Sequence, residues 1–183
     1  MTITRAAACK RDSRAASKGV HKTKIRRATK ADVATLLGWF ALPHAAPFLR
    51  KPSAQQVHDA LDHSDRALFI LEDKDKPVAH LALLDINSRI LNLGIVLVGE
   101  PRCGYGRAAV EWAKQFAFVE ANAHRLWLEV TSDNAAARAL YESCGFIHEG
   151  TWRDGFPADD GTFKDLAAYG MLISEFRTRS VGS

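Results

Sequence analysis

The spacing of hydrophobic residues changes from one segment of the chain to the next, and it predicts the order of strands and helices. Short apolar runs bounded by turn residues indicate strands, whereas apolar residues recurring every three or four positions indicate helices. The predicted strands lie at 24–28, 66–71, 78–85, 89–98, 125–131, 146–152 and 165–173. The predicted helices follow Thr29, Ser53, Gly106 and Asn134, of which Thr29, Ser53 and Asn134 are expected as N-caps.

The connections between these segments predict how the strands pair. Short turns join the strands at 66–71, 78–85 and 89–98, so these three are expected to form antiparallel hairpins. A long helical crossover separates 89–98 from 125–131, which predicts a parallel pair. The fold class is therefore α/β (α+β), with a single mixed, mostly antiparallel sheet of about seven strands flanked by about four helices.

The composition adds limits to this picture. The chain has 183 residues, of which 47% are hydrophobic and 25% charged, and its net charge is +4. These values fit one globular domain, and no apolar run approaches the roughly 20 residues that cross a membrane. Residues 1–23 carry six basic residues and one acidic residue, whereas the other 160 carry 19 basic and 20 acidic residues. We therefore expect a basic disordered tail at 1–23, a domain at 24–176 and a short tail at 177–183, with no nucleic-acid-binding domain.

A loop with two glycines carries the first chemical signal. The apolar strand at 89–98 runs into a segment with Gly104 and Gly106, and a helix follows. The free amides and dipole of a helix start favour an anion, and glycine lets the backbone approach it closely. The same segment also fits the dinucleotide pattern GxGxx[GA] through Ala109, with Glu129 as the ribose-binding acid, so an NAD(P)-binding oxidoreductase is an alternative.

The second signal is the sequence NAAARALYESCGF, which begins at Asn134. Asn134 and Tyr141 are seven residues apart, which places them on one face of a helix two turns apart. A tyrosine beside alanines is most often a core residue. Next to an anion-binding loop, however, the phenol of Tyr141 becomes a candidate proton donor to a leaving thiolate.

Together the two motifs resemble the GNAT acyltransferase superfamily, over about residues 24–176. The segments EGTWRDG at 149–155 and DLAAYGML at 165–172 resemble its ribosomal-protein N-terminal acetyltransferase branch. The resemblance implies a central parallel splay between the strands at 89–98 and 125–131. The sequence departs from the family at Pro101, where the family usually has Gln or Arg, and Arg102 is displaced by one position.

The resemblance also implies the site residues, with acetyl-CoA as cosubstrate in the splay and no metal. Tyr141 would protonate the thiolate, and Glu129 is the candidate base, beside Glu100, Asp85 and His80. Trp39 and Arg153 would contact the acceptor, in a region that also includes His44, Phe48, Trp152 and Phe156. The residues implied in coenzyme binding are Val96, Leu97, Val98, Arg102, Cys103, Gly104, Tyr105, Gly106, Arg107 and Asn134.

These observations predict an acetyl-CoA-dependent N-acetyltransferase that acts on a primary amine, either a protein N-terminus or a small molecule, by direct attack. The alternative in another class is a binding protein that senses acyl-CoA without catalysis. Three cysteines without CxxC spacing favour a reducing, cytoplasmic setting. No membrane partner is expected, and a homodimer through the final strands is a hypothesis.

Overall fold

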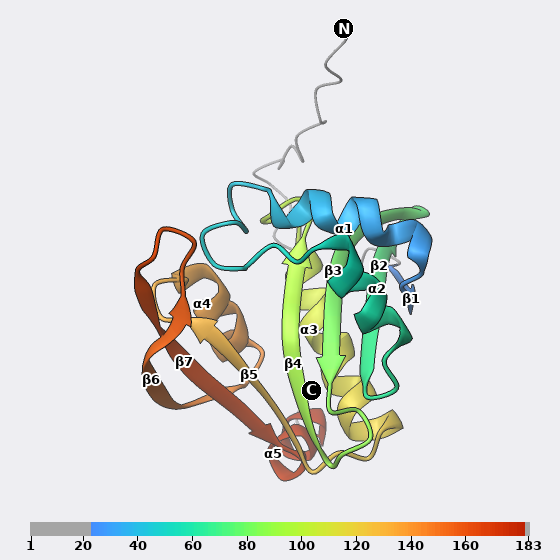
Figure 1. The fold of residues 1–183 in the computed structure, drawn as a ribbon. Coiled ribbons are helices and arrows are strands. Elements are labelled where there is room, and N and C mark those ends of the chain that lie inside the picture. The colour runs from blue at the N-terminus through green and yellow to red at the C-terminus, as the bar shows by residue number, and fades with distance from the viewer. Residues whose placement is uncertain (1–22, 182–183) are drawn as a thin grey trace, which may run out of the picture.

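The computed structural model describes residues 23–181, which form one seven-stranded sheet with helices on both faces (Figure 1). The strands are β1 Lys24–Arg27, β2 Arg66–Asp73, β3 Lys76–Leu84, β4 Ile90–Val98, β5 Arg125–Thr131, β6 Ile147–Pro157 and β7 Phe163–Leu172. The α-helices are α1 Val33–Phe40, α2 Ala54–Asp62, α3 Tyr105–Gln115, α4 Ala135–Ser143 and α5 Ile173–Val181, with short helical turns at Lys30–Asp32 and Phe116–Glu120. The strand order is β1-β2-β3-β4-β5-β7-β6.

The pairing confirms the predicted sheet. Of the six strand pairs among the described residues, β4 with β5 is parallel and the other five are antiparallel. The crossover from β4 to β5 contains α3, because a parallel connection has to return the chain to the same end of the sheet. Within residues 23–181, no helix is long and apolar enough to cross a membrane.

The helices begin where side chains satisfy the backbone amides of the first turn. Ser53 Oγ accepts a hydrogen bond from the Gln56 amide at 3.1 Å, and Asn134 Oδ1 accepts one from the Ala137 amide at 3.2 Å. Thr29 precedes the turn at Lys30–Asp32, and the Asp32 carboxylate accepts the Thr29 amide at 2.8 Å. All three predicted N-caps are thus confirmed.

The sheet separates two apolar layers. The larger layer lies under α3 and α4 and receives Leu91 and Leu93 from β4 and Leu126 and Leu128 from β5. The other layer lies under α1 and α2, which Figure 1 shows in front of the sheet. Because side chains alternate along a strand, the residues between these leucines face the α1–α2 side. We call the two sides the α3–α4 face and the α1–α2 face.

The central parallel strands separate after a short paired stretch. Their register pairs are Ile90–Arg125, Leu91–Leu126 and Asn92–Trp127. On its other side, β4 has a bulge at Gly94, because Ala82 pairs with Ile95 while Leu83 pairs with Leu93. A bulge bends its strand and increases the local twist. β4 therefore turns away from β5, and Figure 1 shows the gap between the two strands widening toward the end of β4.

Two segments differ from the prediction. The chain ends in α5, which the sequence pattern did not indicate. There Glu175 Oε2 accepts the Leu172 amide at 2.8 Å, and Phe176 stacks on Phe118 at 5.0 Å between ring centroids. β6 also runs on past residue 152 to Pro157, because a register shift around Asp154 (φ 53°) keeps the chain paired with β7. Residues 1–22, where the basic tail is expected, lie outside the described residues.

Candidate active site in the gap between β4 and β5

The loop between β4 and α3 has the backbone form of an anion cradle. Arg102 and Gly104 both have left-handed backbone angles, with φ of 65° and 84°, and Gly104 is the N-cap of α3. Left-handed residues in a tight loop turn successive amides toward one point, where the positive end of the helix dipole adds to them. Gly106 is equally constrained, because a β-carbon there would lie 3.2 Å from Leu140 Cδ2 of α4. The predicted role of this loop as an anion site therefore fits its geometry.

The end of β4 offers backbone groups to the gap. The Gly99 amide donates to the Val78 carbonyl at 2.9 Å, so Gly99 directs its amide toward β3. Because backbone groups alternate in direction along a strand, Val96 and Val98 direct theirs away from β3, toward the gap. A strand edge of this kind can pair with the amides of an extended ligand, as was predicted for Val96 and Val98.

Tyr141 lies on α4 at the inner side of the gap. Its side chain is 7% exposed and packs in the large core, with ring centroids 6.1 Å from Phe146 and 6.4 Å from Tyr169. Burial raises the pKa of the Tyr141 phenol well above its usual value, and the nearby Cys144 adds to the effect. No hydrogen bond joins its hydroxyl to another described residue. The phenol therefore stays protonated at neutral pH and retains its proton for a ligand.

Glu129 lies on β5 beyond the last residue that pairs with β4. It is two residues after Trp127, so both side chains are on the α1–α2 face. Partial burial raises the pKa of the Glu129 carboxyl, and among residues 23–181 it has no hydrogen bond or ion pair. Such a carboxylate is a better proton acceptor than a fully solvated one.

Two side chains of the predicted coenzyme set are held by other parts of the protein. The Tyr105 hydroxyl donates to Asp73 Oδ2 at 2.8 Å. The Arg107 guanidinium donates to Ser143 Oγ at 2.7 Å and contacts Cys144 Sγ at 3.8 Å. At Tyr105 and Arg107 the side chain therefore anchors the loop to β2 and to the end of α4. Cys103 is half-buried in the same loop.

Of the predicted acceptor residues, Trp39 and His44 contact the end of β4. The Trp39 indole packs over Gly99, where a β-carbon would come within 3.0 Å of the ring. His44 Nε2 lies 2.9 Å from the Val98 carbonyl and donates to it, since a carbonyl only accepts. Leu97 is buried beside Phe40 and packs in the core. Arg153 is exposed within β6, which runs past the strand end predicted at residue 152.

The other candidates for a base are placed in different environments. His80 is 2% exposed, its Nδ1 is 3.0 Å from the Phe69 carbonyl, and burial lowers its pKa to about 4. It is a neutral core residue at physiological pH. Glu100 is exposed in the loop after β4. Asp85 lies at the end of β3 and lines the cavity described next.

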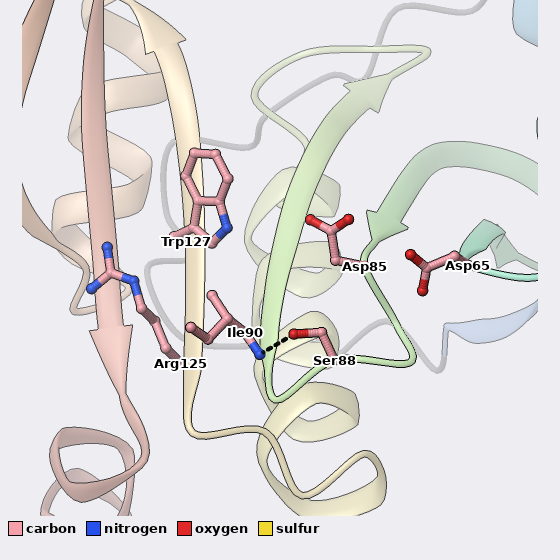
Figure 2. Close-up of a pocket in the computed structure, with 6 residues that line it drawn as sticks. All are labelled: Asp65, Asp85, Ser88, Ile90, Arg125 and Trp127. Atoms are coloured by element: carbon pink, nitrogen blue, oxygen red, sulfur yellow. Dashed lines mark hydrogen bonds between the residues drawn. The ribbon is translucent and has the colours of Figure 1, made fainter.

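A cavity of about 550 Å³ lies on the α1–α2 face where β4 and β5 begin, and Figure 2 shows the six residues that line it. They are Asp65, Asp85, Ser88, Ile90, Arg125 and Trp127. Of these, sequence reasoning had singled out Asp85 alone. It had also passed over Asn92, a polar residue that is 6% exposed within an otherwise apolar strand. The interrupted pattern ILNLGIVLV was the signal for both Asn92 and the bulge at Gly94.

A strand gap with an anion cradle at one end is the arrangement that the resemblance to acyltransferases implies. The model of the acetyltransferase (GNAT) family matches residues 33–146, and the chain belongs to this family. The spermidine N(1)-acetyltransferase of Vibrio cholerae is 29% identical over 147 residues, which cover 78% of this chain and 82% of that enzyme.

Solved structures agree with this assignment. A Vibrio cholerae spermidine N-acetyltransferase in complex with CoA and spermine is 20% identical, with a TM-score of 0.75 over 85% of this chain and 98% of that one. A dodecameric structure of the Vibrio cholerae enzyme matches with a TM-score of 0.70 at 21% identity, over 86% of this chain and 98% of that one. At these identities the likeness establishes the fold.

The protein is therefore an acetyl-CoA-dependent N-acetyltransferase that acts on amines, as predicted. The oxidoreductase alternative and the non-catalytic alternative are not supported. The narrower resemblance to ribosomal-protein N-terminal acetyltransferases stays a prediction. Among the described residues, no group of three or more His, Cys, Asp or Glu is placed to hold a metal ion.

Proposed function

We propose that the acceptor is a polyamine or a similar aliphatic primary amine. The observation that carries this proposal is the match to a spermidine N(1)-acetyltransferase over most of both chains. The site supports it, because unpaired acidic groups at Glu129 and Asp85 lie on the face of the sheet from which an acceptor reaches the gap. A cationic substrate is attracted to such a face. A protein N-terminus is the competing acceptor.

The coenzyme fits the α3–α4 end of the gap. The backbone of Val96 and Val98 would pair with the amides of its extended arm, and the loop from Arg102 to Arg107 would surround the pyrophosphate with amides and positive charge. Leu97, between the two valines, contributes its backbone position while its side chain stays in the core. Asn134 already caps α4 through Oδ1, which leaves its side-chain amide group to donate to the arm.

The reaction follows from the groups on either side of the gap. The neutral amine attacks the thioester carbonyl carbon, a C–N bond forms, and the C–S bond then breaks. A backbone amide near Val96 stabilises the oxyanion. The Tyr141 hydroxyl protonates the departing thiolate, and Glu129 takes up the amine proton, directly or through water. Trp39 and His44, which contact the end of β4, and Arg153 of β6 would contact the acceptor.

A buried thiol supports a reducing environment. Cys144 is a free cysteine on the inner side of α4, and burial raises the pKa of its thiol. Unpaired cysteines are usual in reducing compartments. We therefore extend the proposal to a cytoplasmic location of the enzyme.

The test is an amine panel with acetyl-CoA, read by thiol release and by the mass of the product. The panel contains spermidine, spermine, putrescine, an aminoglycoside, an amino sugar and a peptide with a free N-terminus. We expect acetylated polyamines to form fastest, as judged by kcat/KM. Faster acetylation of the peptide or of the sugars would overturn the proposed acceptor while leaving the enzyme class intact.

A further inference from the structure

The cavity at the start of β4 and β5 is acidic on one side and aromatic on the other. Asp65 precedes β2, Asp85 follows β3, and Trp127 lies on β5 (Figure 2). Ile90 provides an apolar wall and is 47% exposed. Carboxylates beside an indole ring and an aliphatic wall suit an alkylammonium group, through charge attraction, a cation–π contact and methylene packing.

The positive charge at this cavity is already neutralised. Arg125 is ion-paired through its guanidinium to the Glu149 carboxylate, which lies across Gly170 of β7. The Asp85 carboxylate has no hydrogen bond or ion pair with any residue in 23–181. Asp65 Oδ1 accepts the Asn87 backbone amide at 2.9 Å. The two aspartates therefore leave the cavity with a negative balance that a cation would compensate.

A second observation lies between this cavity and the gap. Asn92 is 6% exposed and sits on the α1–α2 face in register with Trp127, and its amide makes no hydrogen bond with any described residue. Its side-chain oxygen would lie 3.1 Å from a β-carbon at Gly94. Asn92 therefore places a polar side chain on the same face as Ile90 and Trp127, which both line the cavity.

The distances match one kind of ligand. From the level of Asn92, Val96 is three strand steps away once the bulged Gly94 is discounted, which is about 10 Å at 3.3 Å per step. The nine bonds between the terminal nitrogens of spermidine, each about 1.5 Å and zigzagged, span on the order of 11 Å. An amine reacting near Val96 would place its far ammonium group at the level of Trp127.

We propose that the cavity lined by Asp65, Asp85 and Trp127 is a subsite for the distal ammonium group of an extended di- or triamine. The Asn92 side chain lies at the level of this distal ammonium group, in register with Trp127. The subsite selects acceptors that carry a second positive charge about 10 Å from the reacting nitrogen. This inference rests on the proposed polyamine acceptor. It adds the residues that select acceptors by the distance between their two charged ends.

The test compares spermidine with butylamine, which has the same reacting group and no second charge. Asp85→Asn keeps the left-handed backbone of this position (φ 57°), since Asn adopts it as readily as Asp. We expect Asp85→Asn to raise the KM for spermidine about five- to tenfold with kcat within about twofold, and to raise the KM for butylamine much less. Trp127→Leu is expected to have the same selective effect.

Asp75→Asn is the matched control. Asp75 lies in the turn between β2 and β3, at the opposite end of these strands from Asp65 and Asp85, and its ion pair with Lys24 is exposed. Asp75→Asn should leave the kinetics of both spermidine and butylamine unchanged. An equal rise in KM for spermidine and butylamine, or no rise in Asp85→Asn and Trp127→Leu, would overturn the subsite while polyamine acetylation stood.

Calorimetric binding of spermidine gives a readout that needs no turnover. The subsite predicts weaker binding to Asp85→Asn than to the wild type or to Asp75→Asn. If the wild type failed to acetylate polyamines, the proposed function would fail, and the binding series would still decide the subsite. Equal binding by all three proteins would overturn it.

Discussion

Asn92 and Trp127 are the last residues of β4 and β5 that face each other in register. From Ile90–Arg125 up to this pair the two strands are hydrogen-bonded, and beyond it they separate. One side of the pair borders the acidic cavity, and the other borders the gap that is the proposed site of acetyl transfer. The bend that produces the separation comes from the bulge at Gly94, two residues further along β4.

The bulge gives the first prediction. A β-carbon at Gly94 would lie 2.9 Å from Leu84 Cδ1 and 3.1 Å from Asn92 Oδ1, so Gly94→Ala should lower the free energy of unfolding by about 1–3 kcal/mol. It should also reduce acetyl transfer, because both Leu84 and Asn92 would have to move. Urea denaturation and kcat/KM measure the two effects.

Gly38→Ala is the control for that substitution. Gly38 is in α1, and a β-carbon added there would have no neighbour within 4 Å, so alanine should stabilise the helix by about 0.5–1 kcal/mol. A Gly94→Ala protein as stable as the wild type would contradict the crowding at the bulge.

Two neighbouring tyrosines give the second prediction. Tyr141→Phe should lower kcat about 100-fold with little change in Tm, because its hydroxyl bonds no described residue and is the proposed proton donor to the thiolate. Tyr169→Phe should lower Tm with little change in kcat. The Tyr169 hydroxyl donates to Glu142 Oε1 at 2.7 Å and accepts from Arg138 Nε at 3.1 Å. Kinetics and thermal melts of both variants separate the roles, and a Tyr141→Phe enzyme of full activity would refute the proton-donor assignment.

Glu129 gives a prediction with a defined sign. Burial raises its carboxyl pKa, so the carboxylate is lost at a higher pH than usual, and kcat/KM should fall as pH drops through that raised pKa. Glu129→Gln should lower the rate and remove this acidic limb. Because the pKa of Glu129 is higher in the folded state than in the unfolded state, its protonation stabilises the fold below the unfolded-state pKa. This stabilisation is lost as pH rises through the folded-state pKa. At neutral pH the variant should therefore be at least as stable as the wild type, and a less stable variant would argue against this assignment.

The contribution of Asp32 to stability depends on pH in the opposite direction. The Arg26 guanidinium, bonded to Asp32 at 2.8 Å, lowers the pKa of this buried carboxyl from 3.8 to about 2. Its stabilisation is present above the unfolded pKa and is lost as pH falls through about 2. The size is about 2 kcal/mol. Asp32→Asn should remove that much stability at neutral pH and less in strong acid, as measured by denaturation at each pH, whereas Asp75→Asn should change little at either.

The elements and the parallel pair could be predicted because each depends on local signals. Caps such as Ser53 and Asn134 form bonds within three residues, and the length of the crossover alone required β4 and β5 to be parallel. Helix α5 was missed because its contacts, Phe176 on Phe118 and Glu175 on the Leu172 amide, are made to residues outside its own pattern.

The chemistry of the site could be predicted less completely. The coenzyme-binding role of the motif residues at the cradle stays a prediction, and the side chains of Tyr105 and Arg107 bond to Asp73 and Ser143, which lie 32 and 36 residues away. The acidic cavity joins Asp65, Asp85 and Trp127 from three different strands or strand ends. The spacing of these residues along the chain does not predict their proximity, because that proximity depends on the register of the sheet.

The two faces of the sheet have a kinetic consequence. The anion cradle belongs to the α3–α4 side, and the acidic cavity belongs to the α1–α2 side. The thioester and the amine can therefore enter from opposite directions and occupy the gap together. Neither has to leave before the other arrives, so initial-rate plots at several fixed concentrations of one substrate should intersect, and no acetylated form of the protein should accumulate.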